Sequence, residues 1–141
     1  MEGVFYDAIG LLKLADWYIK EGVDYQVSLG VFIKQWIDSD TLLSLYTSGS
    51  TGKPKLVVMS KQAMVNSATA TGDYFKLKAG NSALSCLPFD YIAAKMMFVR
   101  AYVLGLELYC IKPSSSPLKT LKRGYDFCAL VPLQLENSVE Q

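Results

Sequence analysis

The sequence predicts an α/β fold in which strands and helices alternate along the chain and the strands form a mainly parallel sheet. Three observations support this fold class. Apolar runs of strand length recur from residue 41 onward, helical runs of ten or more residues separate most of them, and glycine, proline or serine marks their boundaries. The chain has 141 residues, of which 51% are apolar and 19% are charged. It is therefore large enough to bury one core, and we do not expect disorder.

Residues 1–40 are expected to form a helical lead. The run 5–21, FYDAIGLLKLADWYIKE, places apolar residues at helical spacing. The run 25–37, YQVSLGVFIKQWI, favours a second helix, although its β-branched and aromatic content also fits a strand.

Residues 41–141 carry the alternation of strands and helices. Strands are expected at 41–47 and 56–60, and Ser60 stands where the N-cap of the following helix would be. The later elements are, in order, a strand at 82–88, a helix at 92–104 ended by Gly105, a strand at 106–111, a short helix at 117–124, a strand at 125–132 and a helix from residue 133. Right-handed crossovers between these strands would cover both faces of the sheet with helices.

Composition excludes several classes of function. With 14 basic and 13 acidic residues the net charge is +1, which gives no reason to expect nucleic acid or an anionic membrane as a partner. No uninterrupted apolar run is long enough to span a membrane, and the first residues lack the features of a signal peptide, so we expect a cytoplasmic chain. The absence of histidine excludes His-based triads and the common zinc arrangements, and no metal site is predicted from the residues. Cys86, Cys110 and Cys128 stand in apolar contexts and are expected to be buried free thiols.

Residues 46–55, YTSGSTGKPK, form a glycine loop between two predicted strands. A Walker A loop is excluded, because Gly49 and Gly52 are too close together and Pro54 follows Lys53. The residue types nevertheless suit a polyphosphate, since glycines expose backbone amides, serine and threonine offer hydroxyl donors, and lysines add positive charge. Composition alone leaves two alternatives open, a phosphate-binding loop and a solvated hairpin.

The same ten residues resemble the phosphate-binding signature of the adenylate-forming superfamily, which includes acyl- and aryl-CoA synthetases, peptide-synthetase adenylation domains and luciferases. The superfamily pattern of an aromatic residue, Thr-Ser-Gly-Ser/Thr-Thr-Gly, a basic residue, Pro and Lys is met at every position from Tyr46 to Lys55. The resemblance implies a loop that closes over the β- and γ-phosphates of ATP with Mg²⁺. Contacts to the ATP phosphates are then expected at Thr47, Ser48, Gly49, Ser50, Thr51, Gly52 and Lys53, with the two glycines as hinges and Lys55 as an anchor of the loop.

Residues 87–108, LPFDYIAAKMMFVRAYVLGLEL, are similar to the next motif of the superfamily, in which Leu-Pro and a histidine precede a helix that lines the acyl pocket. Tyr91 stands where the histidine is usual, so acid–base chemistry at this position is not expected. On the predicted helix, Lys95 lies in line with Tyr102 on a stripe that we expect to be partly solvated. Arg100 lies on a strongly apolar stripe, where its guanidinium either meets backbone carbonyls or water or binds a second carboxylate of the substrate.

The run Tyr-Ile-Ala-x-Lys-Met-Met-x-Val-Arg-Ala, together with the short lead before the glycine loop, is similar to o-succinylbenzoate–CoA ligases of menaquinone biosynthesis. This resemblance implies an ATP-dependent acid–CoA ligase that uses ATP, Mg²⁺ and CoA on a dicarboxylic acid, with Tyr91 and Arg100 in the substrate pocket. A fatty- or aryl-acid–CoA ligase is the first alternative. A nucleotide-binding module without catalysis and an interaction protein in which the loop is a relic remain open.

The resemblance covers about residues 40–135. Members of the superfamily continue with an adenine-binding segment, a glutamate that helps to hold Mg²⁺, a ribose-binding aspartate and a C-terminal domain with a catalytic lysine, none of which precedes Gln141. We therefore expect residues 41–141 to be the early part of an AMP-binding large domain, with no catalytic residue inside it and no ligation by these residues alone. Uncovered apolar faces of such a part would favour self-association.

Overall fold

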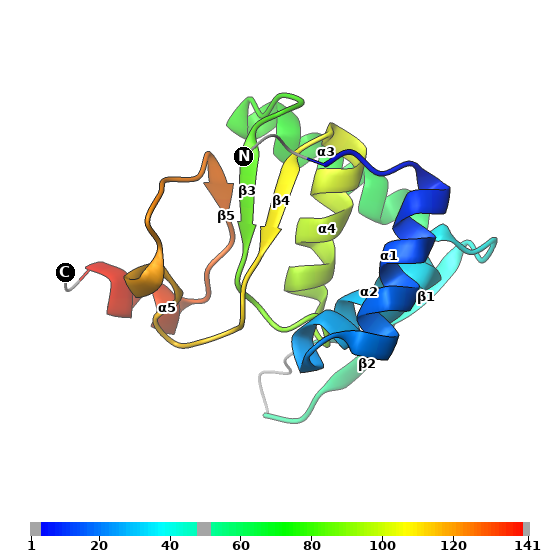
Figure 1. Cartoon of the computed structure of the whole chain (residues 1–141), viewed down its shortest axis with the longest axis horizontal. Coiled ribbons are helices and arrows are strands. Elements are labelled where there is room, and N and C mark those ends of the chain that lie inside the picture. The colour runs from blue at the N-terminus through cyan, green and yellow to red at the C-terminus, as the bar shows by residue number, and fades with distance from the viewer. Residues whose placement is uncertain (1–3, 48–51, 140–141) are drawn as a thin grey trace.

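We describe the protein from a computed structural model, in which residues 4–47 and 52–139 are placed (Figure 1). The chain begins with helices α1 (Ala8–Glu21) and α2 (Asp24–Ile37), followed by strands β1 (Leu42–Thr47) and β2 (Lys55–Ser60). The remaining elements are α3 (Lys61–Phe75), β3 (Ser82–Ser85), α4 (Ile92–Leu104), β4 (Glu107–Cys110), the 3₁₀ helix η1 (Pro117–Thr120), β5 (Phe127–Cys128) and α5 (Pro132–Val139).

The predicted α/β class is confirmed, with a parallel sheet of order β4-β3-β5. The two strands around the glycine loop do not join this sheet. They form a separate antiparallel hairpin in which Leu45 pairs with Val57 and Tyr46 with Leu56. Only residues 48–54 connect β1 to β2, which is too short for the crossover that a parallel pair requires.

The helix boundaries follow local capping. The Ser60 hydroxyl accepts the Ala63 N–H at 3.1 Å, so the predicted N-cap of α3 is confirmed. Gly105 adopts a left-handed φ of 70° and ends α4 where the sequence predicts. The first helix starts later than predicted, at Ala8, because the Asp7 carboxylate accepts the Gly10 N–H at 2.7 Å and caps it there.

The C-terminal elements are shorter than the sequence predicts. The expected helix at 117–124 is only η1, the expected strand at 125–132 is reduced to β5, and β3 ends before Cys86. The buried Gln134 side chain explains the two strands. It accepts the Val131 N–H at 3.2 Å, which begins α5, and it donates to the Cys86 carbonyl at 3.3 Å. These backbone groups therefore bond to an amide side chain instead of to a neighbouring strand.

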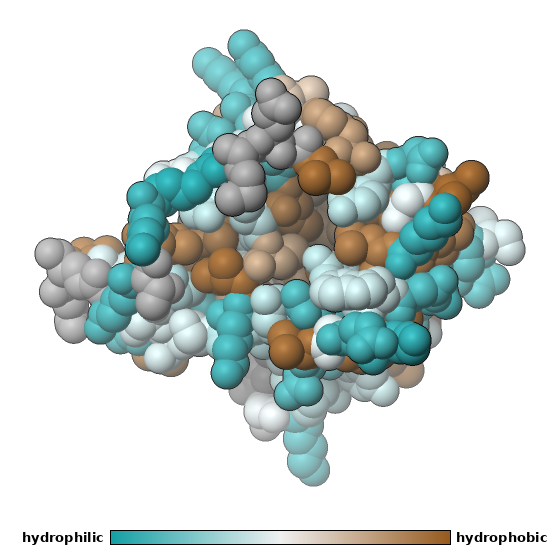
Figure 2. All heavy atoms as spheres, in the orientation of Figure 1, coloured by the Kyte–Doolittle hydropathy of each residue, from teal (hydrophilic) through white to brown (hydrophobic). Residues whose placement is uncertain are grey.

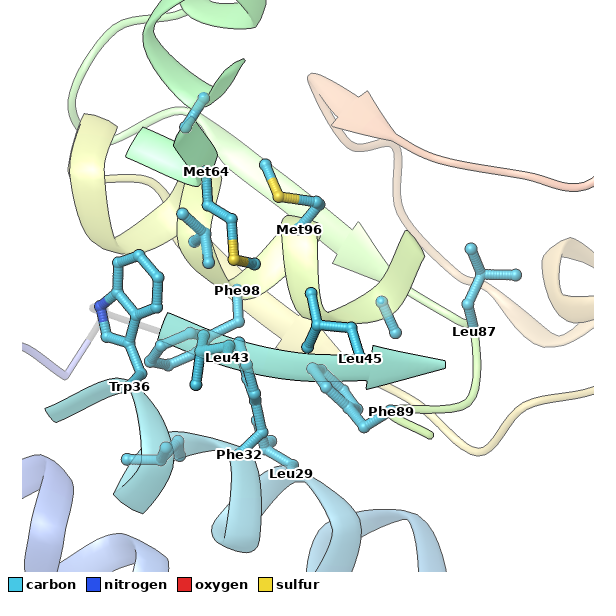
Figure 3. Packing of buried hydrophobic residues seen from close by; sticks show 14 of the residues in the cluster. Leu29, Phe32, Trp36, Leu43, Leu45, Met64, Leu87, Phe89, Met96 and Phe98 are labelled. Carbon is cyan, nitrogen blue, oxygen red and sulfur yellow. The ribbon is translucent and has the colours of Figure 1, made fainter. Parts of the chain in front are cut away.

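The main core lies where α4 is enclosed by the hairpin, α2 and α3 (Figure 3). Leu43 and Leu45 point inward from β1, while Phe32 and Trp36 come from α2 and Phe98 from α4. The Phe32 and Phe98 rings meet edge to face with centroids 5.7 Å apart. Each fully buried side chain of this size contributes about 1.5–3 kcal/mol to folding, so the hairpin is fixed to α4 by its inner face.

The opposite face of the parallel sheet carries a cluster of aromatic and charged side chains. Leu108 packs into the core beneath α4, so Tyr109 points the other way along β4. The Arg123 guanidinium lies 4.5 Å from the Tyr109 ring centroid and 5.0 Å from that of Tyr125. The sequence predicts helices on both faces of the sheet. The described residues that meet at this point of this face are Tyr109, Arg123 and Tyr125.

The cysteine prediction is correct only in part. Cys86 is buried, Cys110 is half-buried, and Cys128 is exposed. In the edge strand β5, Phe127 faces the core, so the next residue points away from it. The expectation of a buried thiol at Cys128 is therefore wrong.

The surface is mixed, with apolar side chains between hydrophilic ones (Figure 2). The outer face of the hairpin is one such place, since Leu42, Tyr46, Leu56 and Val58 are each at least half exposed. Self-association through faces of this kind stays a prediction. No helix in the described ranges is long and apolar enough to cross a membrane.

Candidate functional site

The glycine loop joins the two strands of the hairpin, and its ends lie in the described part of the chain. The Thr47 hydroxyl donates to the Lys55 carbonyl at 3.4 Å, which closes the base of the loop. Lys53 and Lys55 expose their side chains to solvent. Ser48, Gly49, Ser50 and Thr51, four of the expected phosphate contacts, fall outside the described residues.

Gly52 has the backbone conformation that the glycine loop needs at this position. Its φ is 76°, in the left-handed region that side chains with a Cβ rarely adopt. A Cβ built at Gly52 would meet no atom within 4 Å. The requirement for glycine is therefore one of backbone conformation and not of space.

Tyr91 lies beside the start of this loop. It is the N-cap of α4, follows the carboxyl end of β3, and its backbone forms a parallel bridge with Tyr46 at the end of β1. Figure 1 shows the carboxyl ends of β3 and β4 on the same side of the molecule as the turn of the hairpin. Ligands of parallel α/β sheets bind outside the carboxyl ends of the strands. The fold thus brings Tyr91, Thr47, Gly52 and Lys53 to the edge of the sheet where a ligand is expected.

A hollow of about 700 Å³, which we call the edge hollow, opens next to Tyr91. The Ser28 hydroxyl and the Asp90 carboxylate lie 3.5 Å apart in its wall. Three segments line it: the start of α2, the loop between β3 and α4, and the residues after β4. Their lining residues are Val23, Asp24, Tyr25 and Ser28, then Pro88 and Asp90, then Lys112 and Pro113. The sequence prediction missed this hollow, although prolines soon after two successive predicted strands are a signal that could have indicated a loop-built edge.

Arg100 lies elsewhere on α4. It follows Tyr91 by nine residues, which places it about 13 Å further along the helix. Its Nε donates to the Thr71 hydroxyl at 3.3 Å, and its guanidinium lies 5.9 Å from the Phe127 ring centroid. Burial lowers the pKa of the Arg100 guanidinium. The structure therefore brings Arg100 to the contact between α3, α4 and β5, and not next to Tyr91.

Lys95 occupies an environment that the sequence did not predict. It is only 8% exposed, and its Nζ lies 5.5 Å from the centroid of the Phe32 ring. The expected partly solvated stripe is wrong at this position, because α2 packs over it, while Tyr102 two turns later remains half exposed. Burial lowers the pKa of the Lys95 ammonium, and the charge of Asp90 opposes that change.

A second cavity, of about 340 Å³, lies between the N-terminal segment, α1, α2, α4 and β4. It is largely apolar, and Cys110 and Tyr18 are among its lining residues. Burial raises the pKa of the Cys110 thiol to about 12 and also raises the pKa of the Tyr18 hydroxyl. None of the expected site residues lines this cavity, and a thiol that stays protonated does not act as a nucleophile.

Known proteins show which family the chain resembles over most of its length. The chain is 30% identical over 115 residues to a probable 2-succinylbenzoate–CoA ligase of Mycobacterium tuberculosis. The matched stretch covers 76% of this chain and 30% of that protein. The chain is 35% identical over 74 residues to tyrocidine synthase 3 of Brevibacillus parabrevis, covering 52% of this chain and 1% of that protein.

Among solved structures, the chain is similar to an acyl-CoA synthetase (AMP-forming)/AMP-acid ligase II-like protein from Dyadobacter fermentans. The TM-score is 0.80 and the identity 35%, over 91% of this chain and 37% of that one. The chain thus spans less than two fifths of the length of these similar proteins. The sequence matches the AMP-binding enzyme family over residues 12–140, and the chain belongs to that family.

Proposed function

We propose that the chain supplies the early part of the large domain of an ATP-dependent acid–CoA ligase, with the glycine loop as its ATP-phosphate site. The observation that carries the proposal is the agreement of residues 46–55 with the family signature, joined to the backbone bridge between Tyr46, the first of these residues, and Tyr91. Residues 41–141 are the proposed part of the AMP-binding domain, residues 1–40 its helical lead, and the cytoplasm its location.

The donor set at the loop fits a polyphosphate substrate. Thr47 offers a hydroxyl, Lys53 offers an exposed ammonium, and Gly52 has a left-handed φ with no atom within 4 Å of the position of a Cβ. Together with Ser48, Gly49, Ser50 and Thr51, these residues would bind the phosphates, and Lys55 would anchor the loop. Bound ATP supplies an activated α-phosphorus and a pyrophosphate leaving group.

In the proposed reaction a substrate carboxylate oxygen bonds to the α-phosphorus of ATP, and the bond from that phosphorus to pyrophosphate breaks. The CoA thiolate then bonds to the acyl carbon as AMP leaves. The chain's own contribution is to position the phosphates and to offset the negative charge that develops on them. No group of three His, Cys, Asp or Glu side chains that could hold a metal ion occurs in the described ranges. We therefore propose Mg²⁺ as part of the reaction without assigning ligands to it.

The substrate is proposed to be a carboxylic acid, with o-succinylbenzoate as the first candidate. The similarity to the probable 2-succinylbenzoate–CoA ligase supports this choice, as does the run from Tyr91 to Ala101 at the start of α4. A fatty or aryl acid is the alternative, and it would indicate a related CoA ligase.

The test is acid-dependent exchange of radiolabelled pyrophosphate into ATP, measured on the longest polypeptide that the gene encodes. We expect exchange with o-succinylbenzoate that exceeds exchange with benzoate and decanoate. Lys53→Ala should reduce the exchange by about 10-fold or more, because it removes a charge-assisted contact to phosphate. Lys34→Ala is the matched control. Lys34 lies on α2, outside the glycine loop, and its ammonium pairs with Asp16 of α1 at 2.6 Å. Equal exchange in the Lys53 and Lys34 variants would contradict the proposed phosphate site.

A further inference from the structure

Lys95 is the one buried charged side chain in the described part of the chain. The other buried polar residues there, Ser82, Ser85 and Gln134, are uncharged. It lies on the first full turn of α4, and its N–H bonds to the Tyr91 carbonyl at 3.3 Å. Tyr91 in turn is bridged to Tyr46, at the end of the strand that enters the glycine loop. Lys95 therefore follows Tyr91, which joins α4 to the proposed phosphate site, by one helical turn.

The Lys95 ammonium has no anionic partner among the described residues. The ion pairs there join Lys20 to Glu21, Lys34 to Asp16 and Lys61 to Asp38. Asp90 is near enough to affect the pKa of Lys95, but the two make no ion pair. The contact that remains is with the face of the Phe32 ring. An ammonium removed from water without a carboxylate destabilises the fold, so its presence in this core needs another explanation.

The edge hollow is lined by residues that are close in sequence to Lys95 and to its ring partner Phe32, although Lys95 itself does not line it. Ser28 and Asp90 line the hollow, and each belongs to a segment that also reaches Lys95. Ser28 precedes Phe32 by one turn of α2, and Asp90 is the residue before Tyr91. Ser28 and Asp90, whose polar groups lie 3.5 Å apart in the wall of the hollow, thus connect the hollow to the two segments that hold Lys95.

Arg100 is the weaker candidate for an anion. Its guanidinium already has the Thr71 hydroxyl and the Phe127 ring as partners, and it lies more than two helical turns beyond Tyr91. Lys95 is nearer to Tyr91, more deeply buried and without a hydrogen-bond acceptor in the described ranges. A buried ammonium such as that of Lys95 attracts an anion more strongly than an exposed ammonium does, because water and salt screen it less.

We propose that Lys95 determines the specificity of this ligase for acids that carry a second anionic group, by pairing with the carboxylate that is not activated. The acid enters by the edge hollow, which is lined by the carboxylates Asp24 and Asp90 and by Lys112, and reaches Lys95 past the contact between Ser28 and Asp90. This inference rests on the proposed function and names the residue that selects its substrate.

The experiment compares two acids that differ in one carboxylate. o-Succinylbenzoate carries a carboxylate on its ring, and 3-benzoylpropanoate has hydrogen in its place. Equilibrium binding of each acid is measured by calorimetry on the longest polypeptide that the gene encodes, in the wild type, Lys95→Met, Lys95→Arg and Lys34→Met. Thermal unfolding of each variant is measured in parallel.

We expect Lys95→Met to weaken binding of o-succinylbenzoate by about 10- to 100-fold while leaving 3-benzoylpropanoate within about twofold of the wild type. Lys95→Arg should keep part of the preference for o-succinylbenzoate, and Lys34→Met should leave the affinity for both acids unchanged. The melting temperature of Lys95→Met should be unchanged or higher, because a buried cation without a carboxylate is removed.

Three results would overturn the assignment. One is an equal loss for both acids together with a lower melting temperature, which a merely structural role predicts. Another is loss of the preference in Arg100→Met but not in Lys95→Met. The third is no difference between the two acids in the wild type. Failure of the proposed function has a separate signature, since it would be the absence of acid-dependent pyrophosphate exchange in the wild type.

Discussion

The backbone of Tyr46 is bridged to that of Tyr91, although the two residues belong to a hairpin and to the start of a helix. Tyr46 is the last residue but one of β1, and Tyr91 is the N-cap of α4. Both side chains are partly exposed. The glycine loop is thereby held at one end against the helix that carries Lys95, so the two segments are joined by this backbone contact as well as by the core packing between β1 and α4.

We predict that Gly52→Ala destabilises the fold by conformation alone. The φ of 76° is unfavourable for alanine, while the space around the new Cβ is open. The free energy of unfolding should fall by roughly 1–2 kcal/mol, as measured by urea denaturation. Gly124→Ala is the control, because a Cβ there also meets open space but φ is outside the left-handed region. Equal stability of the two variants would show that the loop adopts another conformation at residue 52.

The two faces of β1 should differ sharply in their response to truncation. Leu45 is fully buried against the core, and Leu42, on the same strand, is 58% exposed. Leu45→Ala should lower the free energy of unfolding by about 2–5 kcal/mol, because it leaves a cavity in the main core. Leu42→Ala should change it by less than about 0.5 kcal/mol. Denaturant unfolding measures both, and similar losses would mean that the hairpin does not pack by its inner face.

The sequence predicts those parts of the fold that depend on neighbouring residues. Ser60 and Gly105 bound their helices by local hydrogen bonds and backbone conformation, and both were predicted correctly. The length of β5 was not predictable in this way, because Gln134 must first fold back onto Cys86.

The same distinction holds for the candidate site. The glycine loop is a contiguous motif, so its residues were recognised without the structure. The edge hollow is formed by three segments that only the tertiary fold brings together. Lys95 was predicted to be partly solvated because helical periodicity shows which residues share a stripe, but not which other helix covers it.

The contact between α1 and α2 depends on a glycine. A Cβ at Gly30 would lie 2.8 Å from the Ala15 carbonyl oxygen and 3.1 Å from Ile19 Cγ1, so the two helices would have to move apart. We expect Gly30→Ala to lower the free energy of unfolding by about 1–3 kcal/mol despite the better helix propensity of alanine. Val31→Ala, at a more exposed position of the same helix, is the control. A stability of Gly30→Ala equal to or above the wild type would contradict the close packing.

The Asp126 carboxylate should make stability depend on pH in the acid range. Its Oδ2 accepts the Ser82 N–H at 2.7 Å and the Ser82 hydroxyl at 2.9 Å, which joins β5 to the start of β3. These bonds lower the pKa of Asp126, the backbone N–H most of all, because they favour the charged carboxylate.

A carboxyl whose pKa is lower in the folded state than in the unfolded chain stabilises the fold fully above its ordinary pKa of about 3.9, and this stabilisation is lost as pH falls through the lowered value. We therefore expect the wild type to lose stability more steeply below about pH 4 than Asp126→Asn does. Asp73→Asn is the control, since the Asp73 side chain is exposed and makes no hydrogen bond within the described ranges. Urea unfolding at a series of pH values measures the slopes, and identical slopes for the wild type and Asp126→Asn would show that the pairing with Ser82 does not set the acid stability.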